Sequence, residues 1–174
     1  IDMYQFLAYS PSVAHALARA IKRGVRVRIL MDSVEKKVPL NNMLSIMMQE
    51  HGVTQAEVDE AIRWRAQLPG DTQIDHGDEF PIEPQQQHTK TIIVDGKTTF
   101  AGSANFDIAS LSGAFREFSV AVRDDATAQA SISRFESIFE SSEHSQPYAS
   151  AFPEPMTFWE SILNKIVHAV LVSE

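Results

Sequence analysis

A strand–helix–strand pattern at the start of the chain constrains the fold more than any other feature of the sequence. Residues 2–8 have the composition of a strand, and Ser10 with Pro11 then favours a helix start, because a hydroxyl can cap a helix and proline fits its first turn. Apolar residues recur at helical spacing up to Gly24, and residues 25–29 then alternate between apolar and basic side chains. A strand, a helix and a strand within about 30 residues predict a βαβ unit with two parallel strands.

The middle of the chain predicts two helices and a long loop. Residues 40–49 carry methionines at helical spacing, which is more typical of a packed core than of an adaptable lipid groove. Thr54 followed by Glu57 matches a capping box, so we expect the second helix to run to Arg65. Residues 68–87 are rich in Gly, Pro, Asp and Gln and predict a loop, and loops of this length are commonly functional.

The second half predicts a hairpin, one more strand and a long helix. Two strands over residues 87–106 meet at an Asp-Gly dipeptide at 95–96, which favours a tight turn. A strand is expected over residues 117–122, and an aspartate at 124 or 125 can cap a helix that runs to about residue 140. The whole pattern predicts an α/β fold with a mixed, mostly parallel central sheet and helices on both faces.

The segment from His88 to Asn105 carries the residues that point to chemistry. Alternate side chains of a strand share a face, so we expect His88 and Lys90 to project together. An imidazole beside an ammonium suits attack on a phosphate diester, because the lysine binds anionic oxygens while the imidazole attacks phosphorus or protonates a leaving oxygen. After the turn the chain returns antiparallel and brings Ser103 and Asn105 to the same end, where Gly102 permits close backbone approach.

The spacing H-x-K-x4-D-x6-G-S-x-N in this segment resembles the HKD motif of the phospholipase D superfamily, and all of its fixed residues are present. The Arg-Gly-Val turn at 23–25 and the Asn-Phe-Asp run at 105–107 are similar to cardiolipin-synthase-like and bacterial phospholipase D members. Many of those members carry an arginine where this chain has Ala109, which weakens the likeness to cardiolipin synthesis specifically. The resemblance covers residues 1 to about 140, with residues 40–87 as an insertion.

The resemblance implies a mechanism in which two such motifs face each other across one site. One histidine forms a covalent phosphohistidine, the other protonates the leaving alcohol, and neither a metal nor another cofactor is required. Carried over to this chain, His88 is the nucleophile or the general acid. The residues then expected to bind the phosphate or line its pocket are Lys90, Asn105, Ser103 and Gly102.

Two carboxylates have expected supporting roles. By the resemblance, Glu117 orients the ring of His88 and sets its tautomer. Asp95 faces away from the reactive pair by strand parity, so we expect a structural role for it. Residues 75–79 contain metal-ligating side-chain types, but they lack the fixed spacing of a metal site and no metal is expected there.

The chain contains a single motif, because none of its other histidines has a lysine two residues later. The site therefore needs a second half. That half is either a second copy of the chain, as in single-motif nucleases of the family, or an upstream motif in a longer chain. Because the sequence starts within a strand, we expect the upstream motif, and His88 is then more commonly the acid.

The expected division of the chain is a catalytic half-domain over 1–140 and a C-terminal part over 141–174. The second part begins with a polar connector and continues as an apolar helix over 156–172, which is too short and too interrupted to span a bilayer. We expect this helix to pack on the domain or on the second half, and contact with a lipid surface is the alternative.

The function expected from these features is hydrolysis or transfer of a phosphatidyl group through a phosphohistidine. The formal net charge of −8 argues against strong non-specific binding to nucleic acid, so a phospholipid is favoured over DNA or RNA. Two alternatives stay open: a metal-independent endonuclease acting as a homodimer, and a non-catalytic interaction half of a larger assembly. The cellular location is also open, with a cytoplasmic or membrane-peripheral site favoured over secretion.

Overall fold

The computed structural model describes residues 1–6, 8–32, 43–65, 73–74, 83–84 and 88–148. Its strands are β1 (Asp2–Gln5), β2 (Arg28–Met31), β3 (Ile62–Arg65), β4 (Gln73–Ile74), β5 (Glu83–Pro84), β6 (Thr91–Val94), β7 (Thr98–Gly102), β8 (Ser119–Arg123) and β9 (Ser145–Pro147). Its helices are α1 (Pro11–Lys22), α2 (Met43–Glu50), α3 (Gln55–Ala61), α4 (Ile108–Leu111) and α5 (Asp125–Phe139). Seven strands form one sheet in the order β8-β7-β6-β1-β2-β3-β9, and β4 pairs with β5 separately.

The predicted βαβ unit is confirmed. β1 and β2 pair in parallel, with Asp2 opposite Arg28, and α1 connects them. Ser10 is the N-cap of α1 with an extended backbone, and Pro11 opens the helix as expected, although the Ser10 side chain makes no capping hydrogen bond. Gly24 follows the helix with a φ of 81°, a conformation that glycine adopts without the steric cost of a side chain.

The sheet is mixed, which confirms the α/β class, but the expectation that it is mostly parallel is wrong. β1–β2 and β2–β3 are parallel, and the other four pairs of the sheet are antiparallel. The reason is connection length, because a parallel pair needs a crossover of about a dozen residues. The turn between Val94 and Thr98 is far too short for that, so β6 and β7 form a hairpin.

The capping box is confirmed, but the helix that it starts is shorter than expected. The Thr54 hydroxyl accepts a hydrogen bond from the Glu57 N–H, and the Thr54 N–H donates to the Glu57 carboxylate. The helix ends at Ala61, and residues 62–65 form β3 with alternating buried and half-buried side chains. Residues 62–65 therefore pair with β2 instead of continuing the helix, because this pairing buries Ile62 and Trp64 on one face of the sheet.

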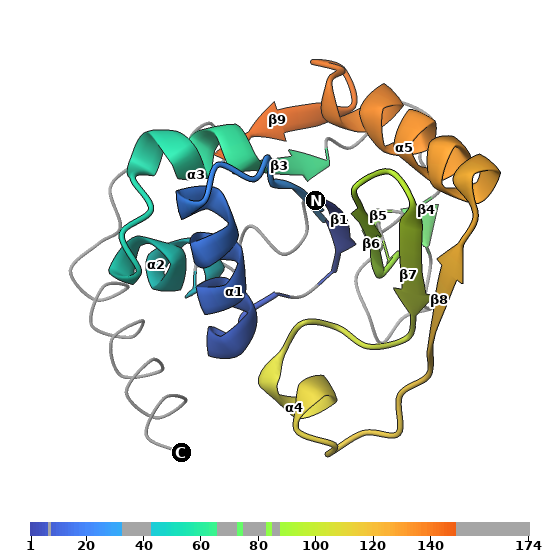
Figure 1. The fold of residues 1–174 in the computed structure, drawn as a ribbon, viewed down its shortest axis with the longest axis horizontal. Helices are drawn as coiled ribbons and strands as arrows, with labels where there is room; N and C mark the ends of the chain where they lie inside the picture. Colours follow the sequence, from blue (N-terminus) through green and yellow to red (C-terminus); the bar gives the residue numbers. More distant parts are fainter. Residues whose placement is uncertain (7, 33–42, 66–72, 75–82, 85–87, 149–174) are drawn as a thin grey trace.

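Helices cover both faces of the sheet, as predicted, and each face has its own core (Figure 1). On one face α1, α2 and α3 pack over a cluster that includes Met43, Met47 and Met48, so the methionines fill a core. On the other face α5 packs over Tyr4, Leu30 and Ile93 through Phe135, Ile138 and Phe139. Asp124 caps α5 by accepting from the Thr127 N–H at 2.8 Å.

The connector expected after residue 140 contains a strand. β9 pairs antiparallel with β3, so the sheet extends beyond the half-domain boundary expected at 140. The acidic run at 75–79, most of the 68–87 loop and the apolar segment at 156–172 lie outside the described residues. Within the described ranges, no helix has the length and hydropathy needed to cross a membrane.

Candidate functional site

All of the motif residues except Asp95 lie at one edge of the sheet, which we call the site edge. β1 and β2 end there because they are parallel, and β6 begins there because it runs antiparallel to β1. β7 then ends and β8 begins at the same edge, and the chain between them carries α4 (Figure 1). The carboxyl ends of parallel strands are the usual place for ligands in open α/β sheets.

His88 and Lys90 are in direct contact at the site edge. The Nζ atom of Lys90 lies 2.9 Å from the Nδ1 atom of His88 and donates to the His88 carbonyl oxygen, also at 2.9 Å. Lys90 is buried and His88 is exposed. The two groups lie together as expected, but His88 precedes β6, so the folded-back lysine side chain joins them rather than strand alternation.

The environment favours the neutral form of the histidine. Burial lowers the pKa of His88, the ammonium of Lys90 lowers it further, and the carboxylate of Asp32 opposes both effects. Burial also lowers the pKa of Lys90, with Glu117 opposing it. An ammonium has no acceptor, so its contact with Nδ1 requires a lone pair there and leaves the proton of the neutral ring on Nε2.

Asp32 was not among the expected site residues. It follows β2 directly, at the site edge, and is 1% exposed. An acidic residue immediately after a buried parallel strand is the sequence signal that could have indicated it. Its negative charge is the one that raises the pKa of His88.

Glu117 occupies a different place from the one expected. Its carboxylate accepts a hydrogen bond from the Ser103 hydroxyl, and within the described part of the chain it makes no hydrogen bond to His88. Ser103 also accepts from the Phe118 N–H at 3.1 Å, and its own N–H donates to the Phe118 carbonyl at 2.9 Å. Ser103 and Glu117 therefore tie the end of β7 to the start of β8.

Gly102 is required for this close approach. A Cβ atom at this position would collide with the Phe118 carbonyl oxygen and with the Ser119 side chain. The close backbone approach expected at Gly102 is thus present, and it is an approach between two strands.

The buried side chain of Gln5 and one buried atom of Asn105, both at the site edge, have unused hydrogen-bonding capacity. Gln5, at the end of β1, is 1% exposed, and neither polar atom of its side chain has a partner among the described residues. The Oδ1 atom of Asn105 is also buried without a partner there. Buried polar atoms are normally paired, so such exceptions mark sites where a polar ligand can bind.

The backbone after Asn105 explains how this residue reaches the end of β1. The Phe106 carbonyl accepts from the Tyr9 and Ser10 N–H groups at 3.0 and 2.9 Å. Asp107 then caps α4 by accepting from the Ser110 N–H at 2.6 Å. The strand after the hairpin and the start of α1 are thereby held beside each other.

Asp95 lies away from the reactive pair, at the other end of β6. It forms the β6–β7 turn with Gly96, and the two residues have φ angles of 52° and 63°. Positive φ at both positions is the geometry of a type I′ turn, which suits an Asp-Gly dipeptide. The predicted tight turn is confirmed.

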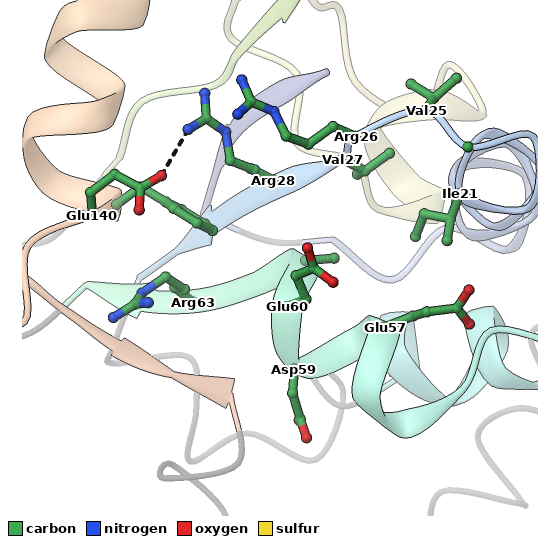
Figure 2. Close-up of a pocket in the computed structure, with 13 residues that line it drawn as sticks. Ile21, Val25, Arg26, Val27, Arg28, Glu57, Asp59, Glu60, Arg63 and Glu140 are labelled. Carbon is green, nitrogen blue, oxygen red and sulfur yellow. Dashed lines mark hydrogen bonds and ion pairs between the residues drawn. The ribbon is translucent and has the colours of Figure 1, made fainter.

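A hollow of about 620 Å³ lies at the edge opposite the site, between the start of β2 and α3 (Figure 2). The two arginines at its β2 and β3 walls, Arg28 and Arg63, already have partners. Arg28 binds three carboxylates, and Arg63 donates to the Ser145 hydroxyl at 2.8 Å while its guanidinium lies over Phe139. None of the described residues that line this hollow has a buried side-chain polar atom without a partner, unlike Gln5 and Asn105 at the site edge. Among the described residues no three metal-ligating side chains converge at any point.

Comparison with known proteins identifies the family. The family profile described as "Cardiolipin synthase, PLD-like domain" matches residues 1–139. The chain belongs to this phospholipase D-like family. The matched range runs from β1 to the end of α5 and contains the whole motif and Glu117.

Solved structures share the fold. Nuc from Salmonella typhimurium, described as a phospholipase D family member, is 25% identical, with a TM-score of 0.54 over 84% of this chain and 79% of that one. NucT from Helicobacter pylori is 15% identical, with a TM-score of 0.58 over 80% of this chain and 78% of that one, and supports the fold alone. A comparison with curated protein sequences gave no match.

Proposed function

We propose that the chain is a phosphodiesterase of the phospholipase D type, that His88 and Lys90 are its reactive pair, and that its substrate is a phospholipid. The observation that carries the proposal is the 2.9 Å contact between Lys90 Nζ and His88 Nδ1 at the site edge. A cation beside a neutral imidazole matches the needs of an anionic diester, because the cation binds the phosphate oxygens and the imidazole can attack phosphorus or transfer a proton.

The proposed reaction has two steps. Lys90 turns from His88 to the non-bridging oxygens of the phosphate, and the Asn105 amide donates to the same group. Neutral His88 then attacks phosphorus, so a phosphorus–nitrogen bond forms while the bond to the leaving oxygen breaks, and the histidine of a second motif protonates that oxygen. The second histidine, now neutral, then takes the proton of water or an alcohol, whose oxygen attacks phosphorus while the phosphorus–nitrogen bond breaks. This step gives hydrolysis or transfer and releases His88.

The second motif comes from another half, either a copy of this chain or an upstream part of a longer one. The surface beside the site edge supports such a partner. β8 and the residue before it leave three large apolar side chains between 38% and 71% exposed at alternate positions, and therefore on one face, namely Phe118, Val120 and Val122. Exposed apolar groups gathered in this way are typical of a surface that another protein surface covers.

The preference for a phospholipid rests on charge and on the family. A net charge of −8 disfavours a polyanionic nucleic acid, because non-specific affinity for DNA comes from neutralising phosphates with Lys and Arg. A metal-independent endonuclease is the second candidate, and the single motif favours it because a homodimer would supply two identical motifs. A non-catalytic half is the third.

The test is an assay of the chain on phosphatidylcholine, phosphatidylglycerol and single-stranded DNA in excess EDTA, together with its mass in solution. We expect release of the lipid head group, unchanged by chelation and abolished by His88→Asn. Cleavage of DNA and of neither lipid would refute the phospholipid as substrate and favour the nuclease candidate. Intact activity in His88→Asn would refute the catalytic role, and loss of activity in EDTA would refute the metal-independent mechanism.

A further inference from the structure

Phe6, the first residue after β1, contacts both members of the reactive pair. Its ring centroid lies 4.6 Å from that of His88, with the two ring planes inclined by 56°. The Nζ atom of Lys90 lies 5.2 Å from the same centroid. Phe6 is outside the motif, and its apolar type within a strand segment predicts only core packing.

We propose that Phe6 is a positioning residue, whose ring holds the imidazole of His88 and the ammonium of Lys90 in their reactive arrangement. The proposal rests on the function proposed above. It goes beyond that function by giving the pair a structural support that no motif residue provides.

His88 needs such a support because the sheet does not hold it. The residue precedes β6 and is exposed, so ladder hydrogen bonds do not fix its position. Its ring is otherwise held by Lys90, and Lys90 has to leave Nδ1 when it turns to a phosphate. The ring of Phe6 keeps the imidazole in place during that exchange.

Phe6 is itself well anchored. The preceding residue, Gln5, pairs with Met31 of β2, and Ala8 forms a bridge with Phe106. The ring is therefore carried by backbone that is tied to the sheet on one side and to the segment after β7 on the other.

The ring also has the electrostatic character that the pair requires. The face of an aromatic ring attracts a cation, so it favours the charged form of Lys90. The same ring covers one side of the otherwise exposed imidazole, and partial burial is the first cause of the lowered His88 pKa. A charged lysine beside a neutral histidine is the combination that the proposed attack uses.

The experiment compares Phe6→Ala, Phe6→Leu and Phe6→Tyr with the wild-type protein in its active assembly. Phe115→Ala is the matched control, because Phe115 is 59% exposed and makes no ring contact among the described residues. The readouts are kcat and KM, the pH profile of kcat/KM, the titration of the His88 ring by NMR and the thermal midpoint.

We expect Phe6→Ala to lower kcat by on the order of 10- to 100-fold, the range for a misplaced catalytic group, with a smaller change in KM. The His88 pKa should rise towards its ordinary value as the ring becomes solvated. Phe6→Tyr should restore both values, since it retains the ring. Phe6→Leu should lie between them, because it keeps an apolar shield without an aromatic face. Phe115→Ala should match the wild type.

An unchanged kcat and an unchanged His88 titration in Phe6→Ala would overturn the inference. Parallel losses of activity and thermal midpoint in all three variants, with no rescue by Phe6→Tyr, would overturn it as well. If Phe6→Ala does not fold, the Leu and Tyr variants decide. Failure of the proposed function gives a different result, because His88→Asn would then keep the activity. The titration of His88 in the Phe6 variants would still show whether Phe6 affects the histidine.

Discussion

The two edges of the central sheet differ in whether their buried charged and polar groups have hydrogen-bond partners. At the edge where β1 and β2 begin, the side chain of Arg28 is 5% exposed and fully engaged. It donates to Asp2 at 2.7 Å, to Glu140 at 2.9 Å and to Glu136 at 3.1 Å. At the site edge, buried amide atoms of Gln5 and Asn105 have no partner among the described residues.

The difference separates stability from reactivity within one sheet. The guanidinium of Arg28 joins β1 and β2 to α5. Burial lowers the pKa of Arg28, but its hydrogen bonds, chiefly the one to Asp2, outweigh burial and raise the pKa above its ordinary value. Unsatisfied polar groups cost stability, and they persist at functional sites where a ligand completes their hydrogen bonds. The contrast implies that substitutions at one edge change folding and substitutions at the other change chemistry.

The largest effect is expected at His88. His88→Asn should lower kcat/KM by on the order of 10³-fold or more, because it removes the nucleophile or proton donor, and should leave the thermal midpoint unchanged. His15→Asn is the matched control, since His15 is an exposed histidine that stacks on His51 away from the motif. A large fall in the thermal midpoint of His88→Asn would contradict the expectation that substitutions at the site edge change chemistry and not stability.

The next effect is expected at Arg28. Arg28→Met should lower the free energy of unfolding by about 3–5 kcal/mol, because it leaves the buried carboxylate of Asp2 without its partner. Urea denaturation measures this change. Lys22→Met, which removes an exposed ion pair with Glu57, should have a much smaller effect. The kcat/KM of folded Arg28→Met should equal the wild-type value, and a catalytic defect would show that the edges are coupled.

The pH dependence of kcat/KM tests the state of His88. Its pKa is lowered from the ordinary value, mainly by burial, so the neutral form is present at neutral pH and is lost only as the pH falls through the lowered pKa. If neutral His88 attacks phosphorus, kcat/KM should be level near neutral pH and fall about tenfold per pH unit below that pKa. A profile in which activity rises as the pH falls would instead assign His88 as the general acid.

The smallest effect is expected at Gln5. Gln5→Met replaces a buried amide without partners by an apolar group of similar length, so the free energy of unfolding should rise by about 1 kcal/mol. Gln146→Met, at an exposed position of β9, should show no such gain. A loss of stability in Gln5→Met would mean that the amide is satisfied in solution and that the site edge is less open than proposed.

Much of the fold could be predicted because its signals are local. The proline after Ser10, the Thr54–Glu57 box and the Asp-Gly turn each act over a few residues, and the structure contains all three. The errors arose where pairing between distant strands decided the outcome. Residues 62–65 were expected in a helix but form a strand that pairs with β2. Residues 145–147 have a sequence typical of a connector but form a strand that pairs with β3.

The reactive pair is the part of the site that spacing alone could indicate, because His88 and Lys90 are two residues apart and the motif is contiguous in the chain. The surroundings of the pair depend on strand order. Asp32, Phe6 and Gln5 reach the site edge because β1 lies between β2 and β6, and Glu117 binds Ser103 because β8 pairs with β7. Burial, pKa and orientation of the pair follow from these long-range contacts, and a short motif carries no information about which distant residues will pack against it.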